Sequence, residues 1–349
     1  MLSNKKPNNF KAMGKRKAKI GMDLGTTNLL VYVDGEGIIF NEPSVIATNV
    51  ATGEVLAIGF NAAKMVGRQH RGIRVVSPLQ QGVVSDLDAA MLLIEFALRK
   101  AENTDIDLAK STALICTPSE VTQIERDAMI SLANRIGVPD VFIEEEIKAG
   151  AIGGGIDMYS SRGSMVIDIG GGTTDIGVLS LGDIVVSESV RIAGNYFDNA
   201  IMNHIQYNHG LLVGKQTAKR VKEEICSLRE NFVEEKTTYA NGRDSLTGFP
   251  RQIILTQSEI RDVVEPFFHS ITNSVLKALQ RTPPELSADI IERGIMLNGG
   301  GALIDGVDEF FTRQIGLKTF VSPNPLTAIV AGTRVLLQNR GSYLVNPNE

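Results

Sequence analysis

The chain has 349 residues, of which 43% are hydrophobic and 21% charged, and its formal net charge is −5. This length allows two domains that each bury a core, and no apolar run approaches the roughly 18 residues of a membrane span, which excludes an integral membrane protein. The two cysteines, Cys116 and Cys226, lie far apart without CxxC spacing. A disulfide framework and a thiolate zinc site are therefore excluded, and a reducing cytoplasm is expected.

Residues 1–18 are expected to form a flexible basic tail, because the first nineteen positions carry seven basic residues and no acidic one. They hold no apolar stretch of the kind found in a signal peptide. Two interpretations stay open: a solubilising tail, and weak attraction to anionic lipid through Phe10 and Met13 beside the basic run. Nucleic acid is disfavoured as a partner, because the rest of the chain is acidic and few aromatic residues interleave with the basic ones.

From Lys19 the sequence KIGMDLGTTNLLVYVDGEGIIF alternates short apolar runs with Gly and Asp, which predicts a β-meander of three strands. Residues 164–189, SMVIDIGGGTTDIGVLSLGDIVVSES, repeat this pattern with two extra glycines, Gly171 and Gly172. The repeat aligns Asp23 with Asp168, Gly25 with Gly170, and Thr26 with Thr173. Such a repeat predicts two domains of similar topology.

Helical patterns separate these strands. Apolar spacing near 3.6 predicts helices over residues 85–103, 217–231 and 261–282, the last of them ended by Pro283 and Pro284. A capping box of Thr117 with Glu120 predicts another helix over 117–137. Residues 111–118, STALICTP, are expected to form a short buried strand. Strands that alternate with helices in this way indicate an α/β fold.

The two glycine turns predict a phosphate site, because turns of small residues expose successive backbone N–H groups to a ligand oxygen. Alone, one such turn is equally typical of an ordinary hairpin. Two turns in register would clamp a polyphosphate, and a third, Asn298 to Gly301, is expected to open a helix beside an anion or nucleoside. The residues predicted to hold phosphate are Gly25, Thr26, Thr27, Asn28, Gly170, Gly171, Gly172, Thr173 and Thr174.

A magnesium ion is expected with the nucleotide. Asp23 and Asp168 precede their glycine turns, so both lie at strand ends and can hold Mg²⁺ through water. The four histidines include no HxxxH pair. A metal site made by protein ligands alone is therefore disfavoured, and any metal should arrive with a ligand.

The order and spacing of these motifs resemble the superfamily of actin, sugar kinases and heat-shock chaperone ATPases, and within it the MreB family of bacterial actin homologues. The resemblance spans about residues 19–340. It rests on the segments DLGTTN, IERDAM, VIDIGGGTTDIGVLSLG, GRDSLTGFP, RTPPELSADI, LNGGGALIDG and PLTAIVAGT.

This resemblance implies an actin-like fold of two related domains and four subdomains around a nucleotide cleft. Domain I would span 19–161, completed by 328–349, with a subdomain at about 47–88. Domain II would span 162–327, with a subdomain at about 199–264. It also implies a cytoplasmic ATPase that binds ATP or ADP with Mg²⁺ and polymerises at the inner face of the cell membrane. Its partners would be copies of itself, the anionic membrane surface and other cell-shape proteins.

The resemblance also implies the role of each site residue. Asp168, Thr173 and Thr174 would take part in catalysis, and Glu125 would position the attacking water. From its own sequence context, Glu125 is equally consistent with a solvated charge on a helix flank. The adenosine pocket would be lined by Lys222, Glu223, Gly299, Gly300 and Gly301.

Some residues depart from the family pattern. Ile147 and Lys148 replace a proline and a methionine beside the hinge between the domains, so the coupling of hydrolysis to domain closure is expected to differ. Leu29 and Asn298 stand where threonine is common. These departures suggest a divergent paralogue, such as one from a wall-less spiroplasma.

Three functions fit the predicted fold. A filament-forming ATPase is favoured. A small-metabolite kinase would need an aspartate base beside an acceptor hydroxyl, and the matching segments offer no second acidic residue for that role. A chaperone-type ATPase switch would be expected to carry a substrate-binding domain after the last helix.

Overall fold

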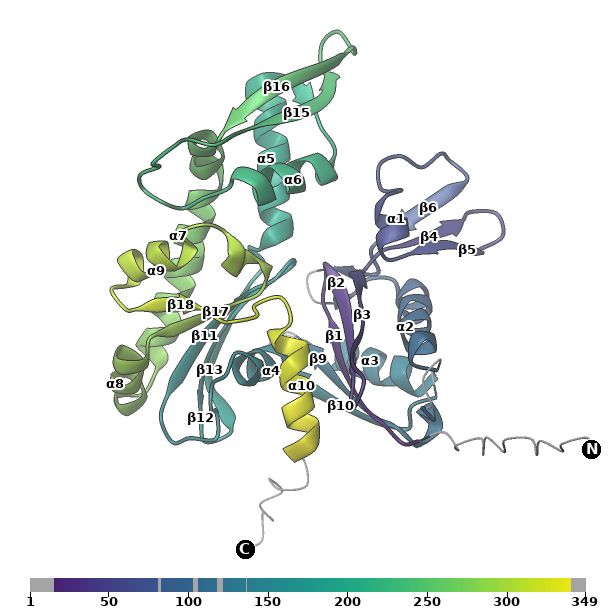
Figure 1. Cartoon of the computed structure of the whole chain (residues 1–349), viewed down its shortest axis with the longest axis vertical. Helices are drawn as coiled ribbons and strands as arrows, with labels where there is room; N and C mark the ends of the chain where they lie inside the picture. The colour runs from purple at the N-terminus through teal and green to yellow at the C-terminus, as the bar shows by residue number, and fades with distance from the viewer. Residues whose placement is uncertain (1–15, 81–82, 103–105, 118–121, 136, 340–349) are drawn as a thin grey trace, which may run out of the picture.

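Two five-stranded sheets of identical topology form the centre of the molecule (Figure 1). The computed structural model describes residues 16–80, 83–102, 106–117, 122–135 and 137–339, without the side chains of residues 83, 101, 102, 125, 132 and 133. The first sheet has the order β10-β9-β1-β2-β3 and the second the order β18-β17-β11-β12-β13. The predicted α/β fold and the predicted repeat of the meander are therefore confirmed, and the repeat extends to two parallel strands beside each meander.

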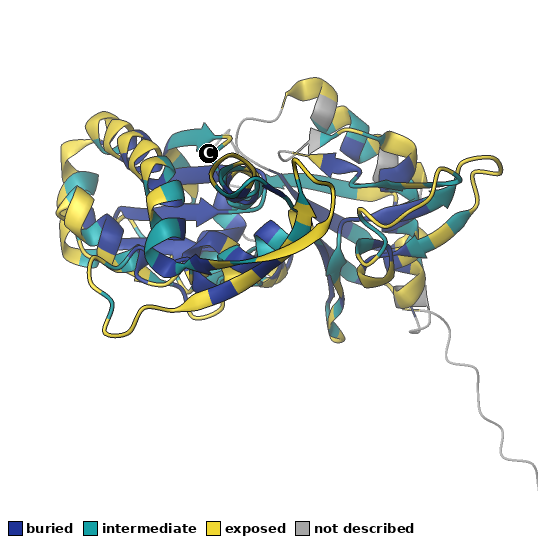
Figure 2. Ribbon diagram, turned by 90° about the horizontal axis from the view of Figure 1, so that it is seen from above, coloured by how far each residue is buried: buried dark blue, intermediate teal, exposed yellow. Residues whose placement is uncertain are grey.

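The strands of the first sheet are β1 (Lys19–Leu24), β2 (Asn28–Val33), β3 (Gly37–Pro43), β9 (Thr112–Thr117) and β10 (Asp140–Glu145). Those of the second are β11 (Ser164–Ile169), β12 (Thr174–Ser180), β13 (Asp183–Val190), β17 (Ile295–Asn298) and β18 (Thr319–Val321). The central strands are buried along almost their whole length (Figure 2), because helices cover both faces of each sheet.

The helices around the sheets are α2 (Leu87–Glu102), α3 (Gln123–Arg135), α4 (Glu146–Gly153), α7 (Gln257–Arg281), α8 (Pro284–Arg293), α9 (Val307–Ile315) and α10 (Ala328–Asn339), with short 3-10 turns η1 (Leu108–Lys110) and η2 (Gly300–Leu303). Helix α10 contacts β1 and β2, whereas α2 contacts β2 and β3 and α3 contacts β10. In the second sheet, α7 contacts β12 and β13, and α8 contacts β11.

Each large sheet carries a smaller unit at its upper end in Figure 1. One consists of β4 (Ile46–Asn49), β5 (Val55–Ile58), β6 (Ile73–Val76) and α1 (Phe60–Ala63), followed by the hairpin of β7 (Leu79–Gln80) and β8 (Val83–Val84). The other consists of β14 (Leu211–Leu212), β15 (Thr237–Asp244), β16 (Pro250–Thr256), α5 (Gly194–His209) and α6 (Lys215–Ile225). The predicted domain limits are consistent with this arrangement and stay a prediction.

Local signals misplaced some element ends. Thr117 was expected to cap a helix, but it pairs with Glu145 in the sheet and ends β9, and α3 begins at Gln123. Its predicted partner Glu120 lies outside the described residues. The third glycine turn opens the 3-10 turn η2, and α9 begins only at Val307. At Thr117 the pairing of strands decided the local structure over sequence propensity.

Helices α4 and α10 cross between the two sheets (Figure 1) and make a close backbone contact. A Cβ atom on Gly153 would lie 1.8 Å from the carbonyl oxygen of Ala328, and one on Gly332 would lie 1.8 Å from that of Ala149. Only glycine allows this approach at both positions. The crossing therefore brings α4, which follows the first sheet, against the helix that returns from the second.

Lys148, on α4, links the two halves of the molecule. Its Nζ lies 3.2 Å from Glu144 Oε1 at the end of β10 and 2.7 Å from Asp183 Oδ1 at the start of β13. The hydrogen bond from Lys148 lowers the pKa of Asp183. The neighbouring Ile147 is fully buried against Gly177 of β12. Ile147 and Lys148, two of the residues that depart from the family pattern, therefore contact the second sheet directly.

Replacing Lys148 by methionine is expected to lower the free energy of unfolding by about 1 kcal/mol, because both ion pairs are lost and the aliphatic stem is kept. This change corresponds to a fall of roughly 2–4 °C in melting temperature, measured by circular dichroism. The control is Lys110→Met, which removes an exposed pair with Asp107. Equal shifts in the two variants would show that Lys148 has no special structural role.

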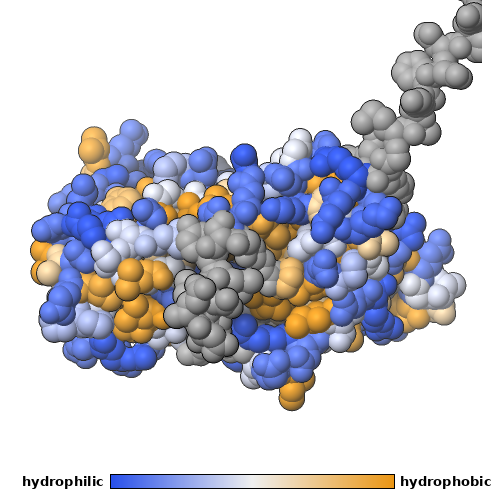
Figure 3. All heavy atoms as spheres, turned by 90° about the horizontal axis from the view of Figure 1, so that it is seen from below, coloured by the Kyte–Doolittle hydropathy of each residue, from blue (hydrophilic) through white to orange (hydrophobic). Residues whose placement is uncertain are grey.

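None of the helices in the described part of the chain combines the length and apolar character that a bilayer crossing needs. Figure 3 shows the molecule from below, with hydrophobic residues scattered among hydrophilic ones on this face.

Candidate functional site

A cavity of about 510 Å³ lies between the two sheets and collects most of the predicted site residues. This volume is within the usual range for a small-ligand site. The predicted residues that line it are Asp23, Gly25, Thr26, Thr27, Asn28, Asp168, Gly170, Gly171, Gly172, Thr173, Lys222, Glu223, Gly299, Gly300 and Gly301. Segments separated by up to about 275 residues along the sequence therefore meet in one place.

The first two glycine turns face each other across the cavity and nearly touch. A Cβ atom on Gly171 would lie 1.9 Å from Thr27 Oγ1, so any side chain there would push the turns apart. A Cβ atom on Gly25 would lie 2.5 Å from the carbonyl oxygen of Asn28 within its own turn. The glycines thus keep both turns tight and leave their backbone N–H groups close to one ligand position.

The second turn is also fixed to α5. The backbone N–H of Gly194 donates to Gly170 O at 3.1 Å, and that of Asn195 donates to Gly171 O at 2.8 Å. Gly170 N in turn donates to Thr173 O at 2.9 Å. These bonds place the N-terminus of α5, with its partial positive charge, next to the turn and favour an anion in the cavity.

Two buried carboxylates stand at the strand ends beside the turns. Asp23 and Asp168 are only 6% and 4% exposed, and Asp23 Oδ1 and Asp168 Oδ2 have no hydrogen-bond partner among the described residues. Burial raises the pKa of Asp23 to about 7, and burial followed by the charge of Asp175 raises the pKa of Asp168 well above its ordinary value. Oxygens left without partners in this way fit a hydrated Mg²⁺, which would compensate both charges.

The sequence prediction missed a third carboxylate, Glu146. It is the first residue of α4 and lines the same cavity. Burial, and then the charges of Asp23 and Asp175, raise the pKa of Glu146 well above its ordinary value. The signal for it was the acidic run Glu144 to Glu146 at the carboxyl end of a parallel strand, an edge where ligands often bind.

Thr174 and Glu125 are the two remaining residues predicted to take part in catalysis. Thr174 is fully buried in β12, its hydroxyl donates to Ile192 O at 2.7 Å, and it does not line the cavity. Glu125 lies on α3, which packs against β10, β8 and α2, and its side chain is not among those described. The catalytic role of Glu125 stays a prediction.

Residues of α6 and of the segments around η2 also line the cavity and differ in character from the aspartates. Lys222 Nζ contacts Asp198 Oδ1 at 2.7 Å and donates to Gly194 O at 3.0 Å, so this lysine is held in position. Leu303 and Leu326 supply an apolar wall that is partly open to solvent. Cys226 also lines the cavity, and burial raises the pKa of its thiol to about 12. The cavity thus has apolar walls as well as the glycine turns and the carboxylates.

Comparison with known proteins identifies the same family that the sequence motifs resemble. The family model described as MreB/Mbl protein matches residues 17–344. The chain belongs to the MreB/Mbl family. The cell shape-determining protein Mbl of Bacillus cereus is 40% identical over 320 residues, 92% of this chain and 96% of that protein. The cell shape-determining protein MreB of Escherichia coli is 38% identical, over 90% of this chain and 91% of that protein.

Solved structures of MreB/Mbl relatives agree. MreB 5 of Spiroplasma citri bound to AMPPNP superposes with a TM-score of 0.89 at 39% identity, covering 93% of this chain and 97% of that one. A structure of the same protein bound to ADP also gives 0.89, at 38% identity and with 94% and 99% coverage. The MamK double helical filament gives 0.78 at 21% identity, with 93% and 99% coverage, and supports the actin-like fold.

Proposed function

We propose that this chain is an actin-like cytoskeletal ATPase that binds Mg-ATP in the cavity, polymerises and contributes to cell shape. The observation that carries the proposal is the pair of facing glycine turns, each preceded by a buried aspartate with an oxygen that has no hydrogen-bond partner among the described residues. The nucleotide-bound structures of a relative and the cell-shape names of others support it. ATP and ADP would occupy the same cavity.

In this proposal the chain holds the polyphosphate from both sides. The backbone N–H groups of the turns at Gly25 to Asn28 and Gly171 to Thr173 would donate to phosphate oxygens, with Gly170 shaping the second turn, and Lys222, Glu223 and Gly299 to Gly301 would surround the adenosine. Asp23 and Asp168 would hold Mg²⁺ through water. When bound, the ion supplies positive charge that neutralises the phosphates and the carboxylates.

Hydrolysis needs a polar group that orients water for in-line attack. Glu146 lines the cavity at the N-terminus of α4, beside both aspartates, and we assign it this role. Thr173 lines the cavity as well, whereas the hydroxyl of Thr174 is bonded to a backbone carbonyl. Thr173 is therefore the better candidate to share the task.

The wider function rests on relatives. MamK, which has the same fold, is seen as a double helical filament, and this supports self-association of the present chain. We place the filaments at the inner face of the membrane, where the basic tail would contact anionic lipid and other cell-shape proteins would bind. Residues 1–15 of the predicted tail lie outside the described residues, whereas Arg16 pairs with Glu36 at 2.8 Å and Ala18 is buried, so positions 16–18 belong to the folded body.

The test is sedimentation of the full-length protein over a concentration series with Mg-ATP, Mg-ADP or no nucleotide. Nucleotide-dependent pelleting above a threshold concentration is expected. Without a pellet in any condition, but with ATP bound, the protein would instead be a soluble ATPase switch, or a kinase if a metabolite were phosphorylated. Flotation of polymerising protein with anionic liposomes tests the membrane surface separately, and no flotation would remove it from the proposal.

A further inference from the structure

A second cluster of chemically active side chains lies in the smaller unit of the second half, at the junction of α5 and α7. His204 and His209 come from the last turns of α5, and Glu259 comes from the first turn of α7. Nε2 of His204 lies 2.7 Å from Glu259 Oε1, and Nε2 of His209 lies 2.5 Å from the same oxygen. One ligand atom from each of the three side chains lies within 4.8 Å of the others.

The backbone on each side fixes these three residues. Gly210, in the left-handed conformation, ends α5 directly after His209, and Arg251 donates to the carbonyl oxygen of His209. Thr256 caps α7, accepting a hydrogen bond from the backbone N–H of Glu259 at 3.3 Å. The three side chains are 18%, 27% and 23% exposed, so an ion can reach them from solvent.

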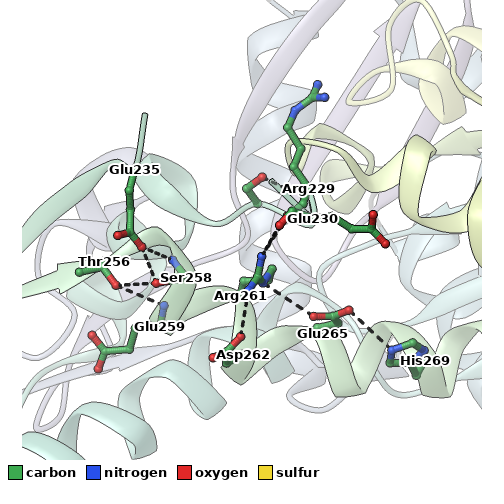
Figure 4. Close-up of polar contacts among 11 residues, drawn as sticks. Arg229, Glu230, Glu235, Thr256, Ser258, Glu259, Arg261, Asp262, Glu265 and His269 are labelled. Atoms are coloured by element: carbon green, nitrogen blue, oxygen red, sulfur yellow. Dashed lines mark hydrogen bonds and ion pairs between the residues drawn. The ribbon is translucent and has the colours of Figure 1, made fainter. Parts of the chain in front are cut away.

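Within the described part of the chain, the carboxylate of Glu259 contacts the two imidazoles and forms no ion pair with a lysine or an arginine. Figure 4 shows its carboxylate directed away from Arg261, which instead contacts Asp262, Glu265 and the backbone carbonyls of Arg229 and Glu230. The carboxylate is thus left to the two histidines, although several acidic residues nearby are paired with arginine.

Two imidazoles and one carboxylate are a ligand set typical of Zn²⁺, and they leave a fourth position for water. Tetrahedral Zn²⁺ with bonds near 2.0–2.1 Å separates its ligand atoms by about 3.3 Å. The two nitrogens must therefore move away from Glu259 Oε1 by less than about 1 Å, which small side-chain rotations provide. Mg²⁺ prefers oxygen ligands and belongs to the cavity instead.

We propose that His204, His209 and Glu259 form a zinc site that fastens the end of α5 to the start of α7. This site is separate from the cavity and does not depend on the proposed ATPase function. Bound metal replaces the hydrogen bonds between the three side chains with bonds to one ion, and it stabilises the folded state by mass action.

The test uses full-length protein without a polyhistidine tag, stripped with chelator, free of nucleotide and titrated with Zn²⁺ or Co²⁺. One equivalent is expected to bind, with visible absorption bands of four-coordinate cobalt and a rise in melting temperature with Zn²⁺. His204→Gln, His209→Gln and Glu259→Gln should each lower the affinity at least about tenfold. Excess Mg²⁺ should not compete.

The matched control is His269→Gln. His269 lies on α7, like Glu259, but it is 48% exposed and has one acidic neighbour, Glu265, at 3.7 Å. This variant should bind Zn²⁺ like the parent protein, and so should Asp168→Asn in the cavity. Absence of a one-to-one cobalt complex in the unmodified protein would overturn the proposal without any variant. Equal affinity in His204→Gln and the parent would overturn it as well.

Discussion

Replacing Asp168 by asparagine is expected to raise the melting temperature of the nucleotide-free protein and to weaken binding of Mg-ATP by roughly 10- to 100-fold. The carboxylate is 4% exposed, and its Oδ2 has no partner among the described residues. A buried charge without a partner costs at least about 1–3 kcal/mol, and asparagine removes the charge at almost constant volume. We expect a rise of roughly 4–8 °C.

The sign of the pH dependence follows from the pKa directions. Burial raises the pKa of Asp23 from 3.8 to about 7, and the pKa of Asp168 is also raised. The folded protein therefore keeps protons that the unfolded chain has already lost. The stability from these groups is present below about pH 4 and is lost as the pH rises through the folded pKa, about 7 for Asp23. The advantage of Asp168→Asn should be larger at pH 8 than at pH 5.

Asp183→Asn is the control for this prediction. Its carboxylate is exposed and bonded to Lys148, which lowers its pKa, so removing it should slightly lower the melting temperature near neutral pH. Thermal unfolding at the two pH values and titration calorimetry with Mg-ATP are the measurements. A destabilised Asp168→Asn protein at pH 8, or one that binds Mg-ATP as tightly as the parent, would contradict the assignment.

The features that could be predicted from the sequence are those with local signals. The alternation of hydrophobic residues and the positions of the glycines predict the two meanders and their turns. Both meanders lie where the repeat indicated. Because equivalent turns end equivalent strands, the meeting of Asp23 and Asp168 in one cavity also followed from the repeat.

The features that could not be predicted depend on contacts between distant segments. Thr117 carries a helix-capping pattern, yet it forms a strand because Glu145 pairs with it across the sheet. Glu146 gains its place from that same parallel pairing, which puts the end of β10 near the end of β1. The His204 and Glu259 pair spans 55 residues, so no short motif could mark it.

Glu146 is expected to orient the attacking water during ATP hydrolysis. Glu146→Gln is expected to lower the rate of ATP turnover by about 100-fold or more, because the amide is a weaker acceptor for the attacking water. The affinity for ATP should change little, since glutamine keeps the shape of the side chain and the phosphate-binding turns are untouched. Phosphate release from pre-bound Mg-ATP in a single turnover measures the step directly. Filaments formed by Glu146→Gln with ATP should persist longer than those of the parent protein, if hydrolysis weakens their contacts.

Glu125→Gln is the decisive comparison, because the family resemblance assigns the same role to Glu125. Glu125 lies on α3, with its side chain outside those described, and Glu146 lies in the wall of the cavity. The carboxylate that orients the attacking water should lose most of its turnover when replaced by glutamine, and the other variant should retain turnover within about threefold. Loss of turnover in Glu125→Gln with normal turnover in Glu146→Gln would reverse the assignment. Loss in both would mean that two carboxylates order the water, with Thr173 as the next residue to replace.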